Sequence, residues 1–143
     1  MKAYIDANIV IYAVTHDPKY GSACAAVLKD MKEGKLEAVA SSLVVLEIMN
    51  ALQRFNASHR RQLETPIEVS EVVNALFSLP IEWVDMTVLV MEKTLPHIAV
   101  THPSDAVHLA TMEIEGITKI ITADHDFDRI DGVSRIDPLT WKA

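Results

Sequence analysis

The stretch Lys2-Ala3-Tyr4-Ile5-Asp6-Ala7-Asn8-Ile9-Val10-Ile11-Tyr12-Ala13-Val14 decides the class of fold. Its first part, Lys2 to Ile5, predicts a short strand that ends at Asp6. Asn8 to Val14 then predicts an apolar helix, which the sequence His16-Asp17-Pro18 breaks. The chain therefore opens with a strand followed directly by a helix, the repeating unit of α/β folds.

The same alternation continues along the rest of the chain. Further helices are predicted at 19–33, from 41 or 42 to about 55, from 66 to about 79, from 86 to about 95 and at 104–115. Further strands are predicted at 36–40, 81–84 and 119–122, with an edge strand at 133–136 and a turn or short helix at 124–130. Residues 56–64 fit neither element. This pattern predicts a three-layer α/β/α fold around a mainly parallel sheet of four to five strands.

Length and composition limit the class of protein. A chain of 143 residues, half of them apolar, predicts one domain over residues 1–143. No apolar run approaches the roughly 18 to 20 residues that cross a bilayer, so neither a membrane span nor a signal peptide is expected. Cys24 is the single cysteine, which excludes an internal disulfide and fits a reducing cytoplasm.

The net charge of −7 argues against nonspecific binding to nucleic acid, because such binding depends on lysine and arginine. A site built from carboxylates would contribute to this charge, and a bound metal ion would reverse it locally. The densest basic cluster is Arg54, His59, Arg60 and Arg61. It fits either a solvated helix end or a surface that contacts RNA.

Four acidic residues stand at positions where an α/β fold presents its chemistry: Asp6, Glu47, Asp105 and Asp124. Each has an ordinary explanation when taken alone. The three aspartates suit the first turn or the cap of a helix or turn. Glu47 shares a helical stripe with Asn50 and Arg54, as on a solvated face, although it also interrupts a strongly apolar run.

Taken together, the four acids favour a metal site. Three of them follow or approach predicted strand ends, which a doubly wound sheet brings to one edge. Clustered carboxylates repel one another unless a cation neutralises them, and oxygen ligands suit Mg²⁺ or Mn²⁺ better than zinc.

Other kinds of site find little support in the sequence. The histidines form no H-E-x-x-H pattern, and His102 and His108 are too far apart for ligation from adjacent turns of one helix. The two glycine-rich loops that bind phosphate, G-x-x-x-x-G-K-[ST] and G-x-G-x-x-G, are both absent from the sequence. No serine lies in a G-x-S-x-G turn. Cys24 lies on an apolar helix face, where it is expected to pack in the core.

Four motifs, in order, resemble those of PIN domains over nearly the whole chain. YIDANIVIY (4–12) resembles the opening strand and helix of that family, and SSLVVLEI (41–48) resembles its glutamate-bearing helix. PSDAVHLA (103–110) and TADHDF (122–127) are similar to its third and fourth acidic motifs. Small stand-alone members are commonly VapC-like toxins.

The resemblance implies a Mg²⁺- or Mn²⁺-dependent endoribonuclease. Asp6, Glu47, Asp105 and Asp124 would be the catalytic metal ligands, Asn8 and Thr122 supporting groups and Asp126 an extra ligand. It further implies an RNA substrate, products with 5′-phosphate and 3′-hydroxyl ends, a cognate antitoxin and a homodimer. The basic residues that would contact RNA are Arg54, Arg60 and Arg61.

Three other functions remain open from the sequence. One is a PIN nuclease that processes cellular RNA without an antitoxin. Another is an inactive PIN-like module that binds RNA or protein. The third is a phosphoacceptor domain of flavodoxin-like strand order, although such domains usually carry an acidic pair after their first strand, where this chain has Asp6 and Asn8.

Overall fold

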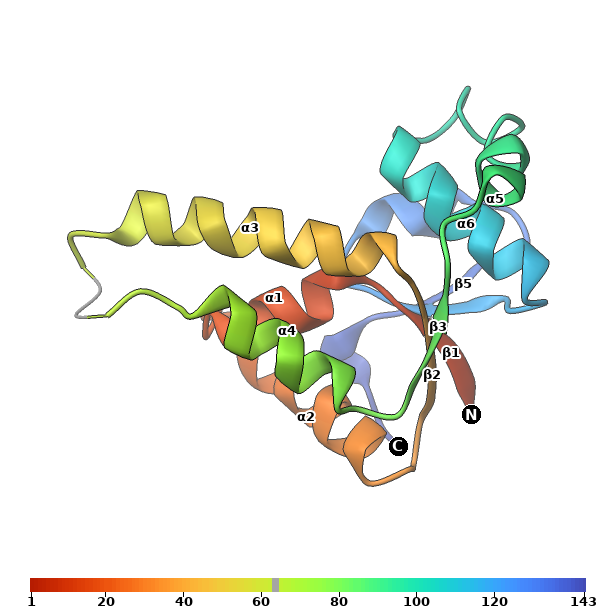
Figure 1. Cartoon of the computed structure of the whole chain (residues 1–143). Coiled ribbons are helices and arrows are strands. Elements are labelled where there is room, and N and C mark those ends of the chain that lie inside the picture. Colours follow the sequence, from red (N-terminus) through yellow and green to blue (C-terminus); the bar gives the residue numbers. More distant parts are fainter. Residues whose placement is uncertain (63–64) are drawn as a thin grey trace.

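The computed structural model describes residues 1–62 and 65–143, in which strands and helices alternate (Figure 1). The strands are β1 (Lys2–Ile5), β2 (Glu37–Ser41), β3 (Ile81–Val84), β4 (Lys119–Ile121) and β5 (Ser134–Ile136). The α-helices are α1 (Ala7–Val14), α2 (Gly21–Lys32), α3 (Leu43–His59), α4 (Val69–Phe77), α5 (Val88–Lys93) and α6 (Pro103–Ile114). Two short 3₁₀ helices follow, η1 (His125–Arg129) and η2 (Pro138–Thr140).

The five strands form one sheet in the order β3-β2-β1-β4-β5, and every neighbouring pair is parallel. The α/β class and the number of strands predicted from the sequence are confirmed. Successive strands run from β1 to one edge of the sheet, and β4 then returns to the other side of β1. This change of direction opens a crevice at the carboxyl ends of β1 and β4, where α/β proteins bind their ligands. The order also differs from the flavodoxin-like 2-1-3-4-5 of the phosphoacceptor alternative.

Helices cover both faces of the sheet (Figure 1). The side chains of β1 alternate between the two faces and contact both layers. Ala3 and Ile5 pack in a cluster with Cys24 of α2, as expected for that cysteine. Tyr4 points to the opposite face and packs against Leu109 of α6. The expected three layers are therefore present, with α1 and α2 on one face and α6 on the other.

Helix α3 is longer than the sequence predicts, and α4 begins later. α3 continues past Phe55 to His59, where the two rings stack 4.0 Å apart. The side chain of Asn56 accepts a hydrogen bond from the Ile67 N–H at 2.9 Å and donates one to the Ile67 carbonyl at 2.8 Å. This contact holds Ile67 in the segment before α4, so α4 starts at Val69 rather than after Pro66.

The other helix bounds differ by a few residues. α5 is shorter than predicted and spans only Val88–Lys93. Leu63 and Glu64, the last two residues of the segment 56–64, lie outside the described residues. None of the helices in the described ranges is long and apolar enough to cross a membrane.

Candidate metal centre

A cavity of about 460 Å³ lies at the carboxyl ends of β1 and β4, and its walls carry four carboxylates. Asp6 follows β1, Glu47 lies within α3, Asp105 lies in the first turn of α6 and Asp124 follows β4. The structure thus brings together the four acids singled out in the sequence, although they come from four separate elements. Their role as metal ligands stays a prediction.

Asp6 is the most buried of these acids, with 7% of its surface exposed. Its Oδ1 accepts a hydrogen bond from the Ala7 N–H at 2.7 Å and so caps α1. Its Oδ2 accepts hydrogen bonds from the Thr122 hydroxyl at 2.6 Å and from the Asn8 amide at 3.2 Å. Asp6 is therefore both a helix cap and a fixed carboxylate in the cavity, so the two interpretations of this residue are compatible.

Asn8 and Thr122 connect the ends of β1 and β4. The Asn8 amide nitrogen donates to Thr122 Oγ1 at 2.9 Å, and its carbonyl oxygen accepts from the Ala123 N–H at 3.2 Å. Thr122 Oγ1 also accepts from the Asp124 N–H at 3.0 Å. These bonds hold Asp6 and Asp124 across the crevice, and the supporting role of Asn8 and Thr122 in a metal site stays a prediction.

The sequence interpretation missed His108, which lies behind the acids. This histidine of α6 is fully buried, and its Nδ1 lies 2.6 Å from the Tyr4 hydroxyl. Its Nε2 lies 2.7 Å from Glu47 Oε1 and 4.0 Å from Asp6 Oδ1. A signal was present, because His108 stands three residues after Asp105 and so shares its side of the helix. Comparing histidines only with one another overlooked it.

Burial and mutual repulsion both disfavour the charged forms of Asp6 and Asp105 in the cavity. Burial and the nearby charges of Asp124 and Asp6 raise the pKa of Asp105 to about 6. Burial also raises the pKa of Asp6 above its usual value. Burial favours the neutral form of His108, but contact with Glu47 and the charge of Asp6 outweigh it and raise its pKa. The positive charge that His108 places beside the carboxylates therefore does not offset the burial of Asp105 and its repulsion by the other acids.

The donor set fits a divalent cation. Glu47 Oε1 and His108 Nε2 are buried, and neither has a hydrogen-bond partner among the described residues. Donor atoms of Asp6, Glu47 and His108 all lie within 4.8 Å of one another. Carboxylate oxygens suit Mg²⁺ or Mn²⁺, and a cation would satisfy the buried atoms that the protein leaves without partners.

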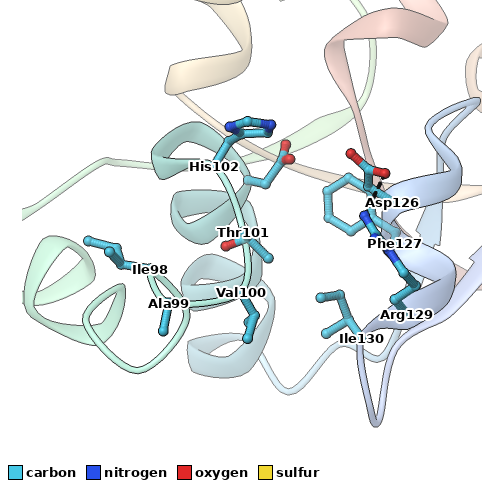
Figure 2. Close-up of a pocket in the computed structure, with 10 residues that line it drawn as sticks. Ile98, Ala99, Val100, Thr101, His102, Asp126, Phe127, Arg129 and Ile130 are labelled. Atoms are coloured by element: carbon cyan, nitrogen blue, oxygen red, sulfur yellow. Dashed lines mark hydrogen bonds and ion pairs between the residues drawn. The ribbon is translucent and has the colours of Figure 1, made fainter.

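Asp126 lies outside this group of acids. Figure 2 shows its carboxylate joined to Arg129, at a distance of 2.8 Å, in a neighbouring cavity of about 510 Å³. Segment 98–102 and Ile130 also line that cavity, and Asp105 borders both cavities. The Asp126 carboxylate is thus paired with Arg129, while its backbone N–H donates to Asp124 Oδ1 at 2.8 Å, and its role as an extra ligand stays a prediction.

The predicted basic cluster is divided by the structure. Arg54 lines the four-acid cavity from α3, about two turns beyond Glu47. Arg60 and Arg61 are exposed at and beyond the end of the same helix, and neither is among the residues that line the cavity. Only Arg54 is therefore placed to contact a group bound at the acids.

Comparisons with known proteins identify a matching family and several solved structures that share the fold of this chain. The VapC20 toxin of Mycobacterium tuberculosis, described as cleaving the sarcin-ricin loop, superposes with a TM-score of 0.68 at 15% identity, covering 88% of this chain and 92% of that chain. VapBC2 of Rickettsia felis, bound to a promoter DNA fragment, gives 0.64 at 15% identity, covering 95% and 98%. A toxin-antitoxin complex from Klebsiella pneumoniae gives 0.61 at 18% identity, covering 95% and 97%.

These solved structures share the fold of the chain, and a comparison with curated protein sequences gives no match. The PIN domain profile matches residues 3–133, a range that contains all four acids and His108. The chain therefore belongs to the PIN domain family.

Proposed function

We propose that this protein is a Mg²⁺- or Mn²⁺-dependent endoribonuclease that hydrolyses RNA phosphodiester bonds and acts as the toxin of a toxin–antitoxin pair. The observation that carries the proposal is the convergence of four carboxylates on one cavity, with buried donor atoms that lack partners in the described chain. Membership of the PIN domain family supports the same nuclease chemistry.

The residues around the cavity suit phosphodiester hydrolysis. A bound divalent ion would neutralise charge on the phosphate and lower the pKa of an attacking water. Asp6, held by three hydrogen bonds, and Glu47, on a rigid helix, would fix the position of that ion. Arg54 would contact a non-bridging phosphate oxygen, and Arg60 and Arg61 would continue the basic path for RNA along α3.

The toxin assignment extends the proposal to a partner. Two of the three reported neighbours, from Rickettsia felis and Klebsiella pneumoniae, are toxin–antitoxin complexes, which favours an antitoxin encoded beside this chain. Expression of the wild type in a bacterial host is expected to stop growth, whereas expression of the Asp6→Asn variant is expected to leave growth unchanged. Co-expression of the product of an adjacent small gene should restore growth. Cleavage without growth arrest would indicate an RNA-processing nuclease instead.

A homodimer is part of the same proposal. Several apolar side chains on α5 and the segment after it are strongly exposed, including Val88 at 75%, Leu95 at 68% and Val100 at 72%. Soluble monomers rarely expose apolar side chains in large contiguous groups. A second copy of the chain would cover this surface.

The nuclease is tested with purified protein and end-labelled RNA, with and without Mn²⁺ or Mg²⁺. We expect metal-dependent cleavage by the wild type, at least a hundredfold loss in Asp6→Asn and in Asp105→Asn, and no change in Asp131→Asn, a matched exposed aspartate outside the cavity. Cleavage that persists in the first two variants would contradict the site. RNA binding without cleavage by folded wild type would favour the inactive binding module.

A further inference from the structure

The contact between His108 and Glu47 is unusual for two buried polar groups. His108 has no exposed surface, and its Nε2 and Glu47 Oε1 approach to 2.7 Å, the separation of a short hydrogen bond. The two atoms are in ion-pair contact, yet neither has a well-formed hydrogen bond in the described parts of the chain. A buried imidazole nitrogen and a buried carboxylate oxygen left in this state are costly, so the pair requires a third group.

A metal ion is the third group that the distances fit. Two ligands at right angles on an ion, each about 2.1 Å from it, lie about 3 Å apart, while opposite ligands lie about 4.2 Å apart. His108 Nε2 is 2.7 Å from Glu47 Oε1 and 4.0 Å from Asp6 Oδ1. Adjacent ligands on one ion are also not aligned with each other, which accounts for a short contact without a hydrogen bond.

We infer that His108 Nε2 is a direct ligand of the same divalent ion that Asp6 and Glu47 hold. This inference rests on the proposed function, because it concerns the ion of the proposed nuclease. It changes the donor set from oxygen alone to oxygen with one imidazole nitrogen. Imidazole binds Mn²⁺ and later transition ions better than Mg²⁺, so the site selects Mn²⁺ over Mg²⁺.

The surroundings of His108 prepare the ring for this role. A ligating Nε2 carries no proton, so the ring proton lies on Nδ1 and is donated to the Tyr4 hydroxyl 2.6 Å away. The same hydroxyl oxygen accepts the Ser41 N–H at 3.1 Å from the end of β2, and it has two lone pairs for the two bonds. Tyr4 is fully buried on β1, so it fixes the ring plane from the centre of the sheet.

The test is pulsed electron paramagnetic resonance of Mn²⁺ bound to protein labelled with ¹⁵N-histidine, in the absence of RNA. We expect a strong ¹⁵N hyperfine coupling in the wild type that is lost in His108→Gln. It should survive in His102→Gln, a control at the N-cap of the same helix, and in His125→Gln, whose ring contacts Asp128 and Arg135. Thermal unfolding checks that each variant folds. If His108→Gln does not fold, survival of the coupling in single glutamine variants of all five other histidines (16, 59, 97, 102 and 125) assigns it to the buried ring.

Metal titrations give a second readout. Mn²⁺ affinity is expected to fall by at least about tenfold in His108→Gln, with a smaller change in Mg²⁺ affinity. Wild-type protein that binds Mn²⁺ and cuts RNA but shows no strong histidine coupling would overturn this inference and leave the nuclease proposal standing. Failure of the wild type to bind either ion, together with failure to cut RNA, would overturn both.

Discussion

Asp105 lowers the stability of the folded protein when its carboxylate is charged. It is half buried at the start of α6, where the helix dipole favours its charge, yet burial and the other acids raise its pKa to about 6. In the unfolded chain the pKa is near 3.8. A carboxyl whose pKa rises on folding stabilises the protein below the unfolded value, and this contribution is lost as the pH rises through about 6.

Asp105→Asn is therefore expected to stabilise the metal-free protein at pH 7.5 and to lose this advantage near pH 4. Because the group is half exposed, solvent screening reduces the gain to about 1 kcal/mol. Urea unfolding in the presence of a chelator, compared between the wild type, Asp105→Asn and the exposed control Asp131→Asn, measures it. A gap that is equal at both pH values would show that Asp105 carries no such strain. Saturating Mn²⁺ should reverse the order, since it binds the folded wild type.

The positions of the acids at one edge of the sheet could be predicted from the sequence, whereas the spacing of His108 from Asp105 does not by itself predict its contact with Glu47. Asp6 and Asp124 follow strands, and the carboxyl ends of parallel strands meet at one edge, so pattern alone indicates their proximity. The contact of His108 with Glu47 depends on how α6 and α3 rotate about their axes, which packing sets and local sequence does not record.

Among the elements, α3 was the one least predictable from local sequence. Its last turn, Asn56 to His59, is polar and carries no apolar periodicity, and what stabilises it is a contact with Ile67, eleven residues away in the chain. Propensity and periodicity describe short windows, whereas this helix end depends on a tertiary contact. The strands, by contrast, were predicted within about one residue, because each is a short apolar run between turn residues.

The contact between Asn56 and the Ile67 backbone is expected to stabilise the end of α3. Asn56→Ala removes two hydrogen bonds to the Ile67 backbone and leaves a partly buried N–H and carbonyl without those partners. We expect a loss of about 1 to 2 kcal/mol in the free energy of unfolding. Asn74→Ala, at an exposed position on α4, is the matched control and should change stability by less than about 0.5 kcal/mol. Equal effects of the two substitutions would refute the role given to Asn56.

At the scale of the whole molecule, the exposed apolar surface of α5 and the segment after it predicts a homodimer. Leu95→Glu and Val100→Glu each place a charge on this surface, where it would be costly to bury in an interface. Sedimentation is expected to show a dimer for the wild type and a shift to monomer, by at least tenfold in the dissociation constant, for the two variants. Leu139→Glu, at an exposed leucine in η2, serves as control. A monomeric wild type would remove the homodimer from the proposal.

The position of β4 has a consequence for the synthesis of the protein. This strand sits beside β1 in the middle of the sheet, yet it comes from the last quarter of the chain, and Asp124 follows it. A growing chain that has not yet released residues 119–124 from the ribosome can form β1, β2 and β3 but has an open edge on β1 and an incomplete set of acids. The proposed cleavage activity therefore arises only after residues 119–124 have been made and β4 has paired with β1.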